Sequence, residues 1–170
     1  MKSVSKSVRS TAYHEAGHAF VACYFRLATH SISIKPEKGV SDGHLHYQNP
    51  LAGVDLHRDY SDEARFKAEK LMIICFAGPT AQRHYNPKGA RKYHAEHDME
   101  IVDKLMMRIA GGSKETMKAH HKWLSLKTLD IVSDPIHWGT ISRLAEALIE
   151  RGSLTEEEID KLVYSPSTSL

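Results

Sequence analysis

The segment TAYHEAGHAF, residues 11–20, decides how the rest of the sequence is interpreted. His14 and His18 are four positions apart, and Glu15 directly follows the first of them. On an α-helix, residues with this spacing lie about 40° apart around the axis and about 6 Å apart along it. Both imidazoles would therefore project from one side of the helix, where they can bind a single metal ion.

The sequence on either side of the histidine pair has the periodicity of an amphipathic helix. From about Val8 to Leu27, apolar or small side chains form one stripe, at positions 13, 16, 17, 20, 21 and 24. The HExxH pattern therefore falls in the middle of a helix, as a metal site of this kind requires. A helix that is merely rich in histidine is the alternative interpretation.

Zinc is the ion that such a pair favours, because it accepts imidazole nitrogen at about 2.0–2.1 Å and prefers tetrahedral geometry. That geometry leaves room for a third protein ligand and one water molecule. Glu15 cannot coordinate together with both histidines, but it can reach the water, so we expect it to act as the general base. Gly17 costs a helix about 1 kcal/mol relative to alanine, which indicates close approach of another helix or of substrate.

The third ligand has to come from a distant part of the chain, and Asp98 is the candidate. It precedes Ile101, Val102, Leu105 and Ile109, which recur at three- and four-residue spacing. A helix that buries those residues would hold Asp98 in its first turn, where the helix macrodipole favours an anion. We therefore expect His14, His18 and Asp98 to meet.

The remaining patterns predict a mainly α fold with a small antiparallel β-sheet, in the α+β class. HSISIK (30–35) and GHLHYQ (43–48) alternate as short strands do. A second helix should begin near Asp62 and show a kink or a restart at Gly78 and Pro79. Further helices are expected from about Asp98 to 110, at 114–132, from the Asp134 cap to 152, and after a Thr155–Glu158 capping box.

At 170 residues the chain is long enough for one domain, which we place at 1–164, with 165–170 as a flexible C-terminal tail. The formal charge is only +2, and the basic residues are scattered, which argues against a nucleic-acid partner.

The longest apolar run, 71–77, is far shorter than the roughly 20 residues that span a bilayer, and no signal peptide is evident. We therefore expect a soluble cytoplasmic protein without a membrane segment.

Several other residue types invite a functional interpretation that the pattern does not favour. His44 and His46 would face the same way on a strand, but no third ligand is nearby in sequence, so exposed surface histidines are the preferred interpretation. Cys23 and Cys75 are expected to be buried reduced thiols, since their spacing suggests neither a disulfide nor a zinc pair. Trp123 and Trp138 are expected to anchor the core or an interface.

Taken together, these segments resemble the peptidase domain of FtsH-type AAA zinc metalloproteases. AYHEAGHA (12–19) looks like that family's zinc helix, and SISIKPEKGVSDGHLHY (31–47) is similar to its strand segment. FAGPTAQR (76–83) sits where the family has a small-residue turn, and HDMEIVDKLMMRIA (97–110) is similar to its aspartate helix. ISRLAEALIERGSLTEEEIDKLV (141–163) resembles the family's C-terminal helical pair, so the resemblance extends from about residue 8 to 164.

The resemblance implies that one zinc ion is held by His14, His18 and Asp98, that Glu15 is the base, and that the reaction is peptide-bond hydrolysis. It also implies that an extended polypeptide substrate adds to the GHLHYQ strand by main-chain hydrogen bonds, and that the chain assembles as a hexamer. The segment before Asp98 is longer and richer in histidine than in the family. For this reason the third ligand has three alternatives, which are His94, Glu96 and His97.

The ATPase module of the family has no counterpart in these residues. No GxxxxGK[ST] loop occurs, so no nucleotide site is expected in this chain, and a separate ATPase partner would have to unfold folded substrates. The sequence therefore predicts a zinc-dependent metalloendopeptidase that cleaves unfolded proteins or peptides through a zinc-activated water. A catalytically silent zinc-stabilised binding or regulatory module and a metal-free helical domain are the competing hypotheses.

Overall fold

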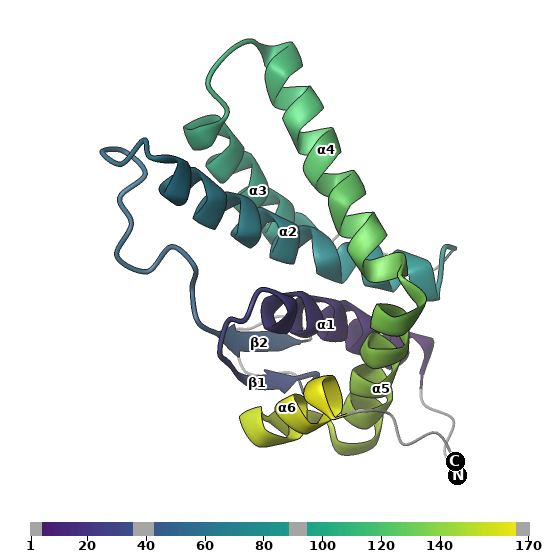
Figure 1. The fold of residues 1–170 in the computed structure, drawn as a ribbon. Helices are drawn as coiled ribbons and strands as arrows, with labels where there is room; N and C mark the ends of the chain where they lie inside the picture. The colour runs from purple at the N-terminus through teal and green to yellow at the C-terminus, as the bar shows by residue number, and fades with distance from the viewer. Residues whose placement is uncertain (1–4, 36–42, 89–94, 166–170) are drawn as a thin grey trace.

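The computed structural model describes residues 5–35, 43–88 and 95–165, and the expected C-terminal tail therefore lies outside the described residues from 166 onward. Within these ranges the chain forms a mainly α structure with one small antiparallel sheet, which confirms the predicted fold class (Figure 1). None of its helices is long and apolar enough to cross a lipid bilayer. The elements are α1 (Lys6–Tyr24), β1 (Thr29–Ser33), β2 (His44–Tyr47), α2 (Asp62–Tyr85), α3 (Glu96–Ile109), α4 (Lys114–Ser133), α5 (Pro135–Arg151), β3 (Ser153–Thr155) and α6 (Glu156–Tyr164).

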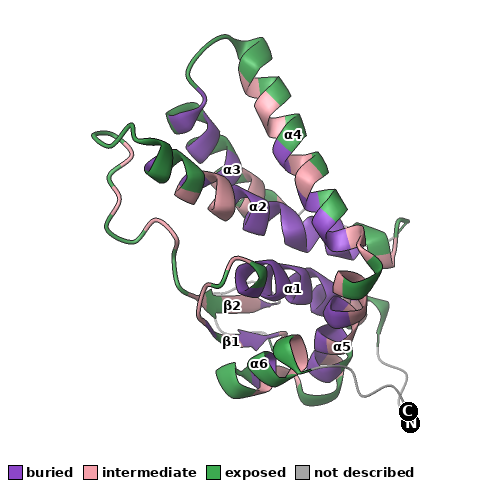
Figure 2. Ribbon diagram, in the orientation of Figure 1, coloured by how far each residue is buried: buried purple, intermediate pink, exposed green. Residues whose placement is uncertain are grey.

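Helix α1 lies at the centre of the molecule and is buried on every side (Figures 1 and 2). The side chain of Ser5 accepts a hydrogen bond from the Val8 amide at its start, and all residues from Ser10 to Cys23 are buried. The sequence predicted one apolar stripe, but α2, α5 and the sheet each pack against a different side of this helix. Polar residues in its middle are therefore enclosed together with the apolar ones.

Helix α2 is the main partner of α1 and contains the expected breakpoint at Gly78 and Pro79. The helix does not restart there, because it runs from Asp62 through Pro79 to Tyr85 without interruption. Pro79 has no amide proton to donate to the Cys75 carbonyl, which normally weakens a helix. Packing overrides this local preference, since every residue from Met72 to Gln82 is buried between neighbouring elements.

The sheet has the strand order β2-β1-β3, and both pairings are antiparallel. Ile32 is the centre of the register, paired with Leu45 on β2 and with Leu154 on β3. The third strand comes from the C-terminal part of the chain and was not predicted, because three residues are too few to show an alternating pattern. In this order β1 is the central strand, and β2 and β3 are the two edges of the sheet that the described residues form.

The C-terminal helices follow their capping signals. Asp134 accepts hydrogen bonds from the amides of Ile136 (2.9 Å) and His137 (3.1 Å), which confirms it as the cap of α5. Gly152 ends that helix in the left-handed conformation, with φ of 82°. Thr155 and Glu158 form the predicted capping box of α6.

Two of the smaller expectations have mixed outcomes. Cys23 and Cys75 are free and buried, as predicted. Trp138 packs against the core cluster, whereas Trp123 is 49% exposed and does not anchor the core. The Trp123 ring lies at the surface of α4, where Lys127 covers it, with Nζ at 5.0 Å from the ring centroid.

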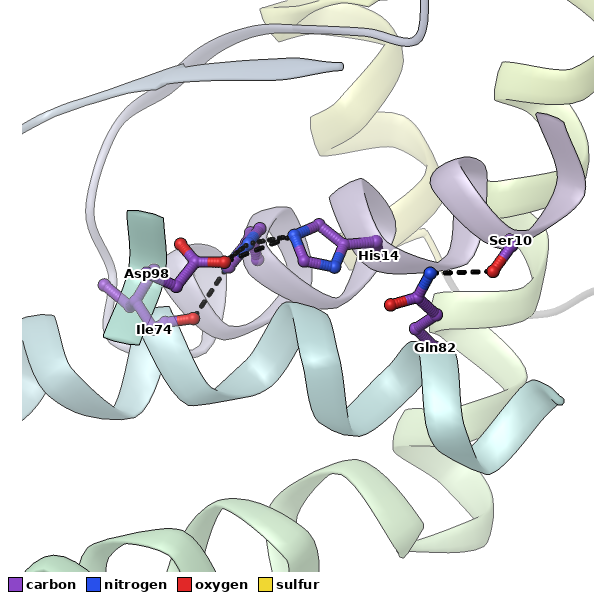
Figure 3. A network of polar contacts seen from close by, with 6 residues as sticks. Ser10, His14, Ile74, Gln82 and Asp98 are labelled. Carbon is purple, nitrogen blue, oxygen red and sulfur yellow. Dashed lines mark hydrogen bonds and ion pairs between the residues drawn. The ribbon is translucent and has the colours of Figure 1, made fainter. Parts of the chain in front are cut away.

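Helices α1 and α2 cross so closely that only glycine fits at the crossing point. A Cβ atom on Gly17 would lie 2.7 Å from the Ala77 carbonyl oxygen and 2.7 Å from Ala81 Cβ. A buried hydrogen bond joins the same two helices nearby, where Gln82 Nε2 donates to Ser10 Oγ at 2.7 Å (Figure 3). The crossing therefore explains the costly glycine within α1.

We predict that Gly17→Ala lowers the free energy of unfolding by about 1–3 kcal/mol, because the added methyl group overlaps backbone atoms that cannot move freely. The matched control is Gly139→Ala in α5, whose added Cβ would meet only Arg143 Nη1 at 4.0 Å. It should stabilise the protein by up to about 1 kcal/mol through helix propensity. Urea unfolding of both variants measures the difference, and changes of the same sign would contradict the prediction.

Candidate metal centre

Three side chains from two helices converge at the centre of the molecule. His14 and His18 project from α1, and their Nε2 atoms lie 3.0 Å apart. Asp98, in the first turn of α3, places its Oδ2 atom 3.3 Å from His14 Nε2 and 3.4 Å from His18 Nε2 (Figure 3). Within the described ranges these three residues form the group of ligand atoms that could hold a metal ion.

The spacing of the three atoms fits a tetrahedral metal. Ligands at about 2.0–2.1 Å from an ion at the centre of a tetrahedron are about 3.3 Å from one another. The observed separations of 3.0, 3.3 and 3.4 Å are close to that value. Calcium is bound by oxygen ligands at longer distances, so neither the ligand types nor the spacing suits it.

Asp98 reaches the histidines because α3 is fixed along its apolar face. Val102, Leu105, Met106 and Ile109 are buried on that face, and α3 packs against α2. The C-terminal end of α3 is held by Arg65 of α2, whose Nη2 donates to the Ile109 carbonyl at 3.0 Å. Burial of the four apolar residues therefore sets the position of a carboxylate at the opposite end of the helix.

The orientation of His18 is set by α2. The ring nitrogen Nδ1 lies 2.7 Å from the Ile74 carbonyl oxygen, which can only accept a hydrogen bond (Figure 3). Nδ1 therefore carries the proton, and Nε2 has a lone pair that points at Asp98 and His14 in the neutral ring. Gly78 allows this approach, because a Cβ atom at that position would overlap the imidazole.

Electrostatic coupling in the metal-free protein favours opposite charges on His18 and Asp98. Burial disfavours the charged form of His18 and lowers its pKa. The attraction and hydrogen bond of the Asp98 carboxylate have the larger effect, so the pKa of His18 is raised to about 9. Burial also opposes the charge on Asp98, yet His18 and His14 hold the pKa of that carboxyl well below its usual range. The ligand pair is thus protonated on the histidine and ionised on the aspartate at neutral pH.

Glu15 lies beside the three ligands without joining them. Its side chain is only 7% exposed, and burial raises its pKa to about 7, with a lowering effect from His18 and a raising effect from Asp98. Gly43, just before β2, packs on the carboxylate, since a Cβ atom at that glycine would lie 2.6 Å from Oε1. Glu15 is therefore a buried acid that can exchange a proton near neutral pH.

The structure also places the alternatives for the third ligand. Glu96 and His97 are exposed at the start of α3 and are not part of the cluster. His94 lies outside the described residues. His44 and His46 do face one another on β2, with ring centroids 5.2 Å apart, and the described residues supply no third ligand for them.

Three residues that shape the centre escaped the sequence analysis. The Ile74 carbonyl carries no side-chain signal, so its contact with His18 could not be predicted. Gly78 and Gly43 are small residues beside the site, and their small size matters only because another element approaches them closely.

A comparison of the chain with protein-family models and with curated proteins found no match.

We predict that Glu15→Gln stabilises the metal-free protein above pH 7. A carboxyl whose folded pKa is raised from 4.5 to about 7 destabilises the fold as pH rises through that interval, and the full cost persists above it. The substitution mimics the protonated acid, so the free energy of unfolding should rise by up to about 3 kcal/mol at pH 8 and hardly at all at pH 4. Urea unfolding over this pH range measures it, with the exposed Glu150→Gln as a control that should show no such trend.

Metal affinity should increase steeply with pH. The proton on His18 has to leave before Nε2 can coordinate, so affinity is expected to rise on the order of tenfold per pH unit between pH 7 and 9. Calorimetric titration of the chelator-treated protein with Zn²⁺, in buffers of different ionisation enthalpy, would also report proton release. A binding constant that is independent of pH would contradict the assignment of His18 as a ligand.

Proposed function

We propose that this protein is a zinc-dependent metalloendopeptidase that hydrolyses peptide bonds in unfolded polypeptides. The observation that carries the proposal is a buried carboxylic acid, Glu15, next to three ligand atoms with tetrahedral spacing. A site that only stabilises a fold has no need of this acid, and burying it costs stability. Residues that reduce stability at a cluster of ligands are typical of catalytic sites.

The roles of the residues follow from their positions. A zinc ion held by His14, His18 and Asp98 would supply Lewis acidity for a scissile carbonyl and lower the pKa of a water molecule. Glu15 would accept a proton on its carboxylate and return it to the leaving amine, because it is a buried acid beside the ligand atoms. The Ile74 carbonyl keeps His18 in the tautomer that coordinates through Nε2.

The position of β2 supports an extended polypeptide as the substrate. This strand is an edge of the three-stranded sheet that the described residues form, and an edge strand is where an extended peptide can add to a sheet. Gly43 leads into it directly from its contact with Glu15. A peptide added along β2 would therefore run toward the buried acid, as the likeness to the FtsH-type peptidase domain implies. The same likeness implies a hexamer and a separate ATPase partner, and the cleavage test requires neither.

We predict that the purified protein contains one zinc ion per chain and cleaves casein or an internally quenched peptide. Glu15→Gln should retain zinc and lose at least about a hundredfold in kcat, because general acid–base catalysis is removed while the ligands stay. Asp98→Asn should lose zinc as well as activity, and Glu150→Gln should change neither.

Elemental analysis and peptide cleavage by the same preparations separate the hypotheses. Zinc bound without cleavage in either the native chain or Glu15→Gln would replace the enzyme with a zinc-stabilised binding module. Absence of stoichiometric metal after purification in zinc-containing buffer would leave a metal-free helical domain. Equal cleavage by the native chain and Glu15→Gln would show that another residue is the base.

A further inference from the structure

A concave surface separate from the metal centre lies where the C-terminal part of α2 meets the C-terminal half of α4. We call it the α2–α4 pocket, and its volume is about 400 Å³, within the range of about 300–1,000 Å³ that is common for ligand sites. Its apolar wall is formed by Pro87, Leu126 and Leu129, and Arg83 and His84 face it from α2. The proposed peptide hydrolysis assigns no role to any of these residues.

The pocket is separate from the metal centre although both use α2. Arg83 follows Ile74 by nine residues, which places it about 14 Å farther along the helix axis. Figure 3 shows the same separation, since Gln82 lies beside Ser10, away from Asp98 (Figure 3). A ligand in the pocket would therefore not contact the metal ligands.

The apolar part of the pocket is about half exposed to solvent. Leu126 is 49% exposed and Leu129 is 44% exposed, and they lie three residues apart on one side of α4. Covering these two side chains with another apolar group would remove apolar surface from water, at about 25 cal/mol per Å². A partner with a branched apolar side chain would gain this free energy.

The charge within the pocket lining has one sign. Arg83 is exposed and has no ion-pair partner among the described residues, and no carboxylate lines the pocket. Lys118 and Lys122 continue the same side of α4 at helical spacing from Leu126 and Leu129, and both are exposed. Asp130 follows Leu126 by four residues and is also exposed, and like the two lysines it is not part of the lining. An unpaired arginine beside exposed leucines therefore matches a partner that is both acidic and apolar.

We propose that the α2–α4 pocket binds an acidic polypeptide segment. In this complex a leucine-like side chain of the segment covers Leu126 and Leu129, and a carboxylate pairs with Arg83. A polypeptide is favoured over a nucleic acid because leucines and a proline form the apolar wall, with no Phe, Tyr or Trp in the lining, and because the chain carries a net charge of only +2. The proposal does not depend on zinc or on catalysis.

The chain contains a built-in reporter for this site. The His84 ring lies 4.2 Å from the Trp138 ring, centroid to centroid, so occupation of the pocket should change the surroundings of that indole. Only two tryptophans occur in the sequence. Trp123→Phe therefore leaves Trp138 as the sole tryptophan, which can be excited selectively over the tyrosines, and Trp123 is not a lining residue.

The test uses the full chain carrying Trp123→Phe and Glu15→Gln, so that a bound peptide is not cleaved. Its fluorescence is titrated with a ten-residue peptide rich in Asp and Glu around one leucine. We expect saturable binding, at least tenfold weaker for Arg83→Glu, for Leu126→Ser and for a peptide with serine in place of its leucine. Binding should weaken with added salt, because part of the attraction is between exposed charges. Arg58→Glu is the control. The Arg58 side chain is 89% exposed on a loop far from the pocket, so this variant should bind the acidic peptide as tightly as the protein without the substitution.

Several results would overturn the proposal. A lysine-rich peptide that binds as tightly as the acidic peptide is one such result, and unchanged binding of the acidic peptide to Arg83→Glu is another. A single-stranded oligonucleotide that gives the same response would show a general attraction of anions. Circular dichroism and thermal unfolding of each variant establish that the fold is intact, and the two side chains substituted in the pocket, Arg83 and Leu126, are exposed. Failure here would leave the zinc and cleavage experiments unaffected, since these use other residues and another readout.

Discussion

The close crossing of α1 and α2 is the constraint on which the rest of the structure depends. Gly17 brings the backbone of α1 against Ala77, and Gly78 brings the backbone of α2 against the imidazole of His18. At this separation the Ile74 carbonyl can hold His18 Nδ1 and leave Nε2 available. A wider crossing would keep the histidine spacing of α1 but lose the contact that orients one of its rings.

The centre that forms at this crossing is costly for the fold. Glu15, His14 and His18 are at most 8% exposed, on a helix that is buried on all sides. The Asp98 carboxylate offsets part of the cost through His18, and this interaction would be replaced by metal coordination. His18 offsets only part of the cost of burying Glu15, so the neutral form of this acid is favoured up to about pH 7. Retaining such a group makes physical sense where a proton has to be moved.

Helix α2 serves two surfaces in succession. Its middle section supplies Ile74 and Gly78 to the metal centre, and its last turns supply Arg83 and His84 to the α2–α4 pocket. Both sections are fixed by burial from Met72 to Gln82, which also carries the helix through Pro79. An acidic segment bound in the pocket would therefore be held at a defined distance from the metal centre, because the same helix contributes to both.

Local periodicity by itself determined the helical fold class, the position of α1 and the shared direction of His14 and His18, because helix geometry relates residues four apart without reference to the rest of the chain. It also pointed to Asp98 as the third ligand, and the segment before Asp98 left His94, Glu96 and His97 as alternatives. Only the tertiary structure brought Asp98 to the histidines, since its position depends on how the apolar face of α3 packs on α2. The third strand, the continuity of α2 through Pro79 and the contacts of Ile74, Gly78 and Gly43 were likewise decided by packing between segments far apart in sequence. Such contacts leave no periodic signal in the segments that make them.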